Sequence, residues 1–309
     1  MAVCFCIGES CIDVHVPPYD RLPQPGEVII NNDLALTLGG SAAYTASCLG
    51  RLGAETWIKI KVGRDSSAGM LRYLLNQEQV NTLVDVDEGE KTQVALTFAR
   101  DNGKGYISSK PLLAVPTREE ITDKGTEVLH IAGYLLYPEL WNESTFELLS
   151  WARKGGILAS LDSQMCPEPE QAKALFHKDL LGNLDVLFMD EKEVCNYFHT
   201  DMVIDVVQEL QQLGVPIISI KMGRKGSITV TKDEVIKVPA FRVKPVNTVG
   251  AGDTYNGAFI YGLLQKWDLP KVASFANLIA GVSTTVRAYK KILSVDEACQ
   301  ILDKTQEEI

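Results

Sequence analysis

Apolar runs of strand length alternate with helical patterns along most of this 309-residue chain. Between the runs, apolar residues recur three and four positions apart, as at Ala42, Ala46 and Leu49. Such alternation is typical of βαβ units, so the sequence predicts an α/β fold whose mainly parallel central sheet carries helices on both faces. Because we find no long internal repeat and no low-complexity linker, we expect residues 1–309 to form one domain. Six runs are predicted to be the strands: 3–8, 56–62, 127–131, 157–161, 185–189 and 216–221.

Four further segments look extended but do not follow the βαβ pattern. The last two of them flank the sequence DNGKG, which is a hairpin-turn signal. We expect these strands to form a small separate sheet that serves as a lid. The alternative is an antiparallel extension of the main sheet. The four segments are residues 12–16, 27–38, 92–99 and 105–109.

Charge and cysteine usage narrow the function classes. The formal net charge of −10 argues against a general nucleic-acid binder, which needs a basic surface. No apolar stretch approaches the roughly 18–20 residues of a membrane span, and the N-terminal MAVCFCIGESCIDV is a poor signal peptide. The cysteines form no CxxC pair, so reduced thiols in a cytoplasmic protein are expected. These cysteines are Cys4, Cys6, Cys11, Cys48, Cys166, Cys195 and Cys299.

The segment NTVGAGDTYNGAFIYGLL, residues 247–264, places small residues where a helix begins. The first N–H groups of a helix have no acceptor within it, and the backbone dipoles add partial positive charge there. Gly250 and Gly252 allow a sharp turn and leave room for a ligand beside Ala251. The sequence therefore predicts an anion site, most simply for a phosphate.

Asp253 follows directly after these small residues. In phosphoryl transfer one carboxylate accepts the proton of the attacking hydroxyl, and Asp253 is placed to do this beside the anion site. The structural alternative is an aspartate that only stabilises the helix N-terminus, a contribution of about 0.5–2 kcal/mol. By itself a GxGD sequence does not distinguish between these two interpretations.

The run NTVGAGDTYNGAFI resembles the C-terminal signature of the ribokinase-like carbohydrate kinases, the phosphofructokinase B group that includes adenosine kinases. The order of the other features agrees with this family over nearly the whole chain. The resemblance implies a three-layer ribokinase-like fold and ATP-dependent, Mg²⁺-assisted phosphorylation of a hydroxyl, such as a CH2OH, on a small sugar. The family often binds a monovalent cation such as K⁺ beside the anion site. It often forms homodimers through its lid sheets, so a homodimer is expected.

The resemblance also implies a substrate site near the N-terminus. In GESCIDVHV, Asp13 corresponds to the family's aspartate that binds substrate hydroxyls. Without the resemblance, an aspartate after a strand is more often a turn residue than a ligand. The segment LGGSAAYTASCLGRLGA resembles the N-terminal signature, whose paired glycines, here Gly39 and Gly40, approach the sugar. Tyr44 occupies the place of an asparagine that usually contacts the sugar, so the identity of the substrate does not transfer.

Three segments correspond to the family's nucleotide-binding elements. FMDEKEV aligns with an NxxE element that organises magnesium and phosphates, with Asp190 in place of the asparagine and Glu193 retained; the alternative is a charged helix start. IKMGRKGSITV looks like a strand–turn–strand near the nucleotide. The implied nucleotide neighbours are Lys221, Gly223, Gly226 and, from FANLIAGVS, Asn277.

Two other functions remain open from the sequence. A nucleoside kinase on the same scaffold is one, since Tyr44 is able to stack on a base. A non-catalytic sugar or nucleotide sensor is the other, favoured by the departures at Tyr44 and Asp190 and opposed by the intact GAGD. A dinucleotide-dependent oxidoreductase is disfavoured because no GxGxxG follows the first strand.

Overall fold

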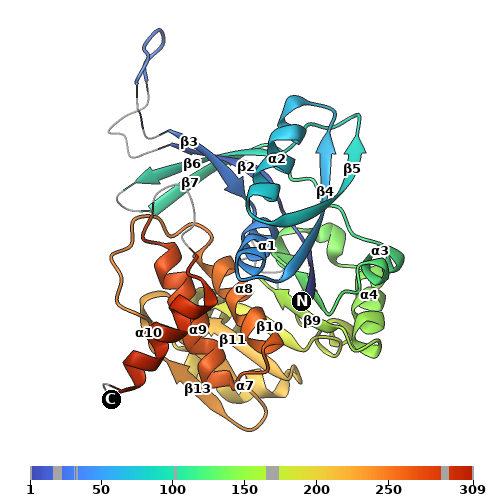
Figure 1. The fold of residues 1–309 in the computed structure, drawn as a ribbon. Helices are drawn as coiled ribbons and strands as arrows, with labels where there is room; N and C mark the ends of the chain where they lie inside the picture. Colours follow the sequence, from blue (N-terminus) through green and yellow to red (C-terminus); the bar gives the residue numbers. More distant parts are fainter. Residues whose placement is uncertain are drawn as a thin grey trace.

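The fold is that of a computed structural model, which describes residues 2–16, 23–30, 32, 34–100, 103–164, 174–286 and 292–307. Its larger sheet has nine strands in the order β13-β12-β11-β10-β9-β8-β1-β4-β5 (Figure 1). All neighbouring pairs from β11 to β5 are parallel, whereas β12 and β13 are antiparallel, so the predicted mainly parallel sheet is confirmed. The strands are β1 (Val3–Ile7), β4 (Glu55–Gly63), β5 (Val80–Asp87), β8 (Val128–Ile131), β9 (Leu158–Asp162), β10 (Val186–Asp190), β11 (Ile217–Lys221), β12 (Ser227–Val230) and β13 (Val235–Val238).

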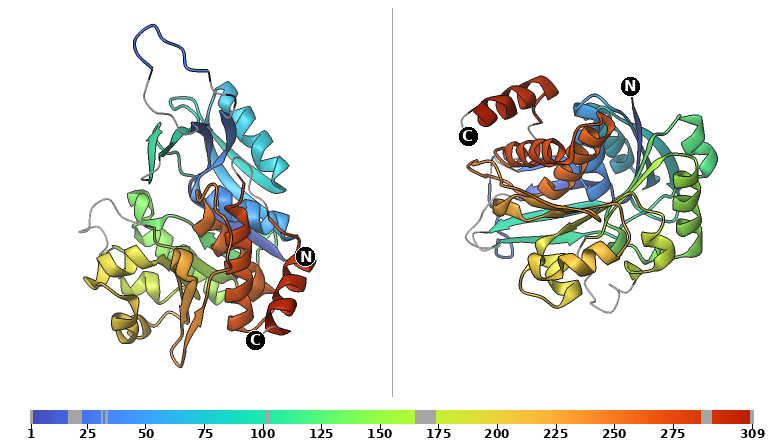
Figure 2. Two further views of the ribbon diagram at one scale, coloured as in Figure 1. Left: turned by 90° about the vertical axis from the view of Figure 1, so that its left-hand side faces the viewer. Right: turned by 90° about the horizontal axis from the view of Figure 1, so that it is seen from below.

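Helices cover both faces of this sheet, as the view from below in Figure 2 shows. Strand β1 illustrates why: Cys4 and Cys6 point into one apolar cluster, while Phe5 and Ile7 point into the other. One cluster is completed by α1 (Ser41–Arg51), α2 (Ser66–Gln77), α8 (Ala251–Leu264), α9 (Leu269–Ser283) and α10 (Val295–Glu307). The other is completed by α3 (Arg118–Asp123), α4 (Glu143–Lys154), α5 (Lys178–Leu181), α6 (Glu191–Phe198) and α7 (Val207–Gln212).

A second, four-stranded sheet stands at the top of the molecule in Figure 1, in the order β3-β2-β6-β7. Strand β2 is antiparallel to β3 and parallel to β6, and β6 is antiparallel to β7, so the sheet is mixed. Since it is a separate sheet, the alternative of an extension of the main sheet is wrong. Its strands are β2 (Cys11–Val16), β3 (Ala35–Gly39), β6 (Val94–Arg100) and β7 (Gly103–Ser108).

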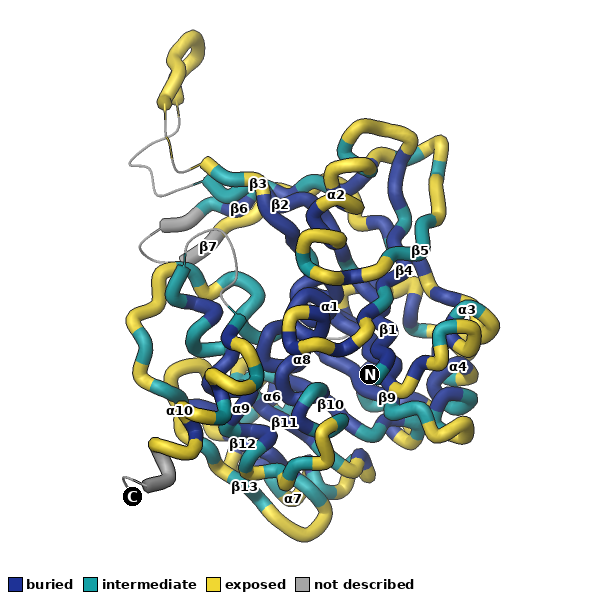
Figure 3. Tube along the Cα trace, viewed as in Figure 1, coloured by how far each residue is buried: buried dark blue, intermediate teal, exposed yellow. Residues whose placement is uncertain are grey.

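One predicted strand is largely wrong. Of residues 27–38, only 35–38 belong to a strand, and the other described residues of this range are irregular. Residues 23–30 project from the molecule, and within them Val28 and Ile30 are 83% and 86% exposed (Figure 3). Their apolar character suggested a strand, but the structure describes no strand of this chain paired with them.

Two class predictions bear on the described residues. None of the described helices is both long and apolar enough to cross a membrane. Six of the cysteines are free thiols, four of them buried, while Cys166 lies outside the described residues. Burial raises the pKa of Cys6 and Cys48, which keeps these thiols protonated and unreactive.

Candidate active site

The N-terminus of α8 has the form expected of an anion site. Gly250 precedes the helix in a left-handed conformation with φ of 68°, and Asp253 lies in the first turn. The Thr254 N–H donates to the Gly250 carbonyl at 2.9 Å, which begins the regular helical hydrogen bonds. The Gly252 N–H comes before that point, among the first N–H groups of a helix, which have no acceptor within it. Ala251 differs, because its N–H makes a long 3.3 Å bond to the Thr248 carbonyl.

Asp253 is held by neighbours at both its carboxylate and its backbone carbonyl. Gln164 Nε2 donates to Asp253 Oδ1 at 3.3 Å, and Thr45 of α1 donates its hydroxyl to the Asp253 carbonyl at 3.1 Å. Gln164 has a left-handed φ of 53°, which costs a residue with a side chain about 1–3 kcal/mol. Its carbonyl accepts a 2.6 Å bond from Tyr197, which helps to maintain this conformation.

A buried ion pair lies beside the α8 N-terminus. Lys221, at the end of β11, donates to Asp162 Oδ1 at the end of β9 over 2.8 Å and to Asn256 Oδ1 of α8 over 3.3 Å. Burial lowers the Lys221 pKa, but Asp162 and Glu193 outweigh it, so the pKa lies above its ordinary value and the lysine is charged. A Cβ added at Gly252 would lie 3.6 Å from Lys221 Cδ, so this cation adjoins the predicted anion site.

Asp190 and Glu193 form a capping box at the start of α6. Glu193 Oε2 accepts from the Asp190 N–H, and Asp190 Oδ1 accepts from the Glu193 N–H, both at 2.8 Å. The charged-helix-start alternative therefore describes their contacts, and it does not exclude a role in binding. Ser163 also donates to Glu193 Oε2 at 2.8 Å. Burial, with Asp162 and Asp190 nearby, raises the Glu193 pKa to about 8.

The carboxylates of Asp190 and Glu193 could supply only part of the coordination of a Mg²⁺ ion. Among the described residues, no group of three or more His, Cys, Asp or Glu side chains could hold a metal ion alone. Mg²⁺ usually takes one or two carboxylates together with waters and substrate phosphates, so a complete protein cage is not needed. A nearby cation would also favour the charged form of Glu193, whose buried carboxyl is otherwise costly to ionise.

The predicted substrate residues gather around the small sheet. Asp13 lies on β2, 4% exposed, where Thr97 of β6 donates to its Oδ1 at 2.6 Å and His15 Nε2 lies 3.5 Å from its Oδ2. Gly39 adjoins it, since a Cβ there would lie 2.8 Å from Asp13 Cβ. Gly40 precedes α1 with φ of 97°, and a Cβ added there would collide with the Glu9 carbonyl oxygen.

Tyr44 lies between these predicted substrate residues and the predicted anion site. It lies in the first turn of α1, buried, and a Cβ added at Gly250 would come within 2.6 Å of its Cδ2. Burial raises the Tyr44 pKa well above its usual value, and Asp13, Cys11 and Asp253 raise it further. The structure therefore brings Asp13, Tyr44 and Asp253 together although they lie far apart in the sequence.

The remaining predicted nucleotide residues lie beside the antiparallel edge of the main sheet. Gly223 is in the turn between β11 and β12, and Gly226 ends it with φ of 101°. Asn277 of α9 is turned toward the sheet, where its Nδ2 donates to Ser227 Oγ at 3.0 Å and to the Val238 carbonyl at 3.2 Å. These contacts give Asn277 a structural role between α9 and the β12–β13 pair.

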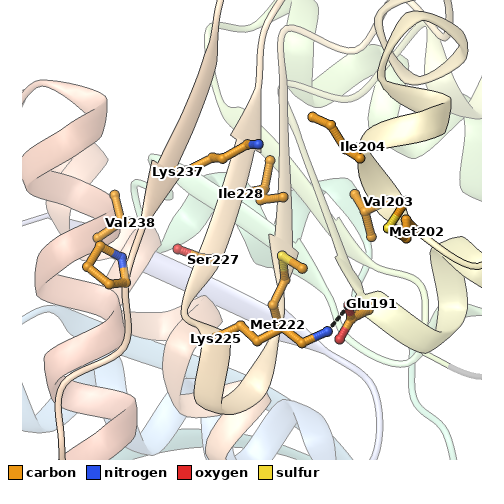
Figure 4. A pocket seen from close by; sticks show the side chains of 11 residues that line it. Glu191, Met202, Val203, Ile204, Met222, Lys225, Ser227, Ile228, Lys237 and Val238 are labelled. Atoms are coloured by element: carbon orange, nitrogen blue, oxygen red, sulfur yellow. Dashed lines mark hydrogen bonds and ion pairs between the residues drawn. The ribbon is translucent and has the colours of Figure 1, made fainter.

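A pocket of about 410 Å³ opens beside the same turn (Figure 4). The ion pair between Glu191 and Lys225, 2.7 Å long, lies along one side of it. Apolar side chains form most of the rest. Asp13 and Asp253 do not line this pocket, so it is distinct from the residues around the α8 N-terminus. The lining residues are Glu191, Met202, Val203, Ile204, Met222, Lys225, Ser227, Ile228, Lys237, Val238 and Pro239.

Sequence reasoning did not identify Asp162, Gln164 and Asn256 as parts of the site. Asp162 could have been identified, because it follows a predicted strand and ligands of α/β sheets lie at the carboxyl ends of strands. Asn256 could also have been identified, since it follows Asp253 by three residues and so lies near it on the helix. No sequence pattern indicated Gln164, because its contact with Asp253 depends on a loop conformation.

Comparison with known proteins agrees with this geometry. Residues 1–292 match the model of the pfkB family carbohydrate kinases. A deoxyribokinase of Salmonella typhi is 26% identical over 288 residues, which cover 90% of this chain and 91% of that protein. A 5-dehydro-2-deoxygluconokinase of Geobacillus thermodenitrificans is 26% identical, with 89% and 85% covered. A nucleoside kinase of Methanocaldococcus jannaschii is also 26% identical, with 93% and 94% covered.

Solved structures share the fold. Arabidopsis thaliana ribokinase complexed with ribose and ATP aligns with a TM-score of 0.79 and 20% identity, over 98% of this chain and 99% of that one. An E. coli protein described as a ribokinase II, in complex with ATP and Mg²⁺, aligns with a TM-score of 0.82 and 20% identity, over 98% and 100%. The predicted three-layer ribokinase-like fold is thereby confirmed.

Proposed function

The chain belongs to the pfkB family carbohydrate kinases and is an ATP-dependent carbohydrate kinase, and we propose that its acceptor is a hydroxyl, most simply a CH2OH, of a small sugar or sugar derivative. The observation that carries the proposal is the position of Asp253 in the first turn of α8, beside N–H groups without intrahelical acceptors and near Tyr44 and Asp13. An acceptor held by Asp13 would thus lie between the Asp13 carboxylate and a phosphate bound at the N-terminus of α8.

In the proposed step Asp253 takes the proton of the acceptor hydroxyl. The hydroxyl oxygen attacks the γ-phosphorus of ATP, a new P–O bond forms, and the bond to the bridging oxygen breaks in line with it, which releases ADP. The Gly252 N–H, within the predicted Gly250–Asp253 anion site, holds the developing negative charge. Lys221 adds a fixed positive charge beside it.

ATP is proposed to lie along the Gly223–Gly226 turn with its phosphates toward α8. Asp190 and Glu193 would hold Mg²⁺ through water, because the capping box already engages one oxygen of each carboxylate. When bound, Mg²⁺ would neutralise phosphate charge. Asn277 would contribute indirectly by fixing β12 and β13 beside this turn. Binding of K⁺ near the anion site stays a prediction, which activity measured in K⁺ and in Na⁺ would test.

The acceptor would be held by Asp13, with backbone at Gly39 and Gly40 close to it and Tyr44 against the α8 N-terminus. In this proposal residues 1–309 act as one cytoplasmic kinase unit, and the small sheet is its lid. Closure of the lid would exclude water, which otherwise competes with the acceptor for the phosphoryl group.

A homodimer through the lid is part of the proposal. On the sheet face opposite to Asp13, the register places Leu36, Val14, Leu96 and Ile107 side by side across all four strands. Leu36 is 48% exposed and Ile107 is 62% exposed. An exposed apolar row of this kind is suited to pairing with a second copy.

The test is ADP release from Mg·ATP with sugars, sugar acids, polyols, phosphosugars and nucleosides. We expect a strong response to one class, with kcat about 10²–10⁴-fold lower in Asp253→Asn because a general base is removed. Asp268→Asn is the matched control, since Asp268 also begins a helix but only caps it. Near-normal turnover in Asp253→Asn would contradict the assignment of the base.

A nucleoside kinase is the second candidate. It is favoured by two aromatic side chains, Tyr44 and Tyr106, whose phenol groups lie near both Asp13 and Asp253. Aromatic rings stack readily on bases. In the same assay, turnover of nucleosides and not of free sugars would support this candidate. Nucleotide binding without turnover of any compound would support a sensor instead.

A further inference from the structure

The face of the small sheet that carries Asp13 is a polar surface, which we call the inner face. Strand register places Asp13 between Thr37 and Ala95, and it places His15 beside Thr97, which pairs with Tyr106 of β7. Thr37 and Thr97 are buried, whereas Tyr106 is 59% exposed. Tyr106 was not among the predicted site residues, and it presents the largest exposed side chain of this set.

The Tyr106 phenol lies within the electrostatic influence of both carboxylates of the proposed reaction. Partial burial raises the pKa of its phenol, and Asp13 and Asp253 raise it further. The same two carboxylates act on Tyr44, which Tyr106 also influences. Tyr44 comes from α1 and Tyr106 from the lid, so the acceptor position between Asp13 and Asp253 is bordered by two phenols from different elements.

A third carboxylate, Glu9, lies beside this position. Its carbonyl adjoins Gly40, and Gln93 donates to its carboxylate while also donating to Ser108 Oγ of β7 at 3.0 Å. Burial raises the Glu9 pKa, and Asp13 raises it further, as expected for two acids close together. Glu9, Asp13 and Asp253 therefore all surround the acceptor position.

Two cationic side chains that the structure describes near this position, Lys221 and His15, are each already engaged with a carboxylate. Lys221 binds Asp162 and Asn256 behind the anion site, where it faces the transferred phosphate. His15, on the inner face itself, lies against Asp13. A carboxylate or phosphate on the acceptor would thus meet the negative charges of Asp13 and Asp253, which repel it most strongly where water is excluded.

We propose that this kinase acts on an uncharged polyhydroxyl acceptor, and that Tyr106 is a specificity-determining residue that contacts it from the lid. This inference rests on the proposed function. Acceptor charge differs among the relatives, since one of them is named for deoxyribose, which is neutral, and another for a gluconate derivative, which is an acid. Carboxylates accept hydrogen bonds from sugar hydroxyls, and phenols pack on the apolar face of a ring while donating one bond.

The first experiment compares acceptors that differ in charge. ADP release is measured with ribose and ribonate, deoxyribose, glucose and gluconate, fructose and fructose 6-phosphate, and adenosine. We expect kcat/KM for the best neutral compound to exceed that for the best acidic one by at least ~100-fold. An acidic compound that is the best acceptor would overturn the inference and leave the kinase proposal intact. Turnover of none would overturn both.

The second experiment changes the charge on the inner face. Tyr106→Lys places a cation beside the acceptor, so the acidic-to-neutral ratio of kcat/KM should rise at least ~10-fold, chiefly through KM. Tyr73→Lys is the matched control, because Tyr73 of α2 is 58% exposed and lies outside the site. It should leave the ratio unchanged. An equal change in both variants, or none in Tyr106→Lys, would overturn the assignment of Tyr106, and circular dichroism verifies folding.

Discussion

The ring of Tyr44 lies directly against Gly250, so closely that a Cβ at position 250 would come within 2.6 Å of Tyr44 Cδ2. Tyr44 lies in the first turn of α1 among the predicted substrate residues, and Gly250 precedes α8 at the predicted anion site. Contact between the two means that the first turn of one helix fixes the conformation of the other. Substitutions on either side should therefore affect catalysis more than binding of one substrate.

Gly250→Ala should impair turnover strongly. The added methyl group collides with the Tyr44 ring and is also strained at φ of 68°. A displacement of about 1 Å in the anion site can cost ~10²-fold in rate, and we expect a loss of kcat of at least this order. Steady-state ADP release with the best acceptor measures it.

Gly53→Ala provides the control for this substitution. Gly53 also has a left-handed φ, 96°, but no atom lies within 4 Å of an added Cβ. It should lose about 1 kcal/mol of stability and keep its activity. Tyr44→Asn combined with Gly250→Ala removes the collision, so the double variant should show less than the product of the two single losses. Independent effects would show that the contact does not matter.

The Lys221–Asp162 pair should be essential to stability. Asp162 is 1% exposed and Lys221 13%, and removal of one partner leaves the other charge buried. Asp162→Asn or Lys221→Met should each lower the free energy of unfolding by about 3–5 kcal/mol, as urea titration would show. The double variant should lose less than the sum. Lys225→Met is the control, because the exposed Lys225–Glu191 pair should contribute at most about 1 kcal/mol.

The sequence predicted the parts of this molecule that depend on local pattern. All six strands of the main sheet expected from apolar runs are present, and the helix after GAGD begins at Ala251. Strand β5 was missed because it is an edge strand with several exposed polar residues. The described residues within 27–34 were wrongly predicted to be a strand, because apolar composition alone does not provide a neighbouring strand.

Contacts between distant segments could not be predicted in the same way. Lys221 and Asp162 are 59 residues apart, and only the register of β9, β10 and β11 brings them together. Tyr44 was singled out as an unusual residue, but its packing against Gly250 depends on how α1 crosses α8. Tyr106 gave no signal, since its relation to Asp13 follows from strand pairing through β6.

Ile107→Asp should separate the proposed dimer. Ile107 lies at the β7 end of the exposed apolar row of the small sheet, and a charge buried there on association would oppose dimer formation. Sedimentation velocity should show a dimer for the wild type and a monomer for the variant. Met202→Asp is the control, since Met202 is 55% exposed on a different surface and should leave the dimer intact. A monomeric wild type would contradict the proposal.

Glu193 should make stability depend on pH in a direction opposite to that of most paired carboxylates. Its folded pKa is raised to about 8 from an ordinary 4.5, so between these values the folded protein keeps a proton that the unfolded chain releases. The free energy of unfolding therefore decreases as pH rises, by at most about 1.4 kcal/mol per pH unit from this group. Above the folded pKa the contribution becomes constant.

Glu193→Gln isolates this contribution, because glutamine keeps the capping box but does not titrate. Urea titrations at pH 5, 6.5 and 8 should show the wild type losing stability relative to the variant as pH rises. His130, whose pKa burial lowers to about 3, acts in the opposite direction below pH 6.5, but it is present in both proteins and cancels in the difference. A difference between the two proteins that stays constant over this range would show that Glu193 is already ionised at pH 5, with Lys221 compensating its burial.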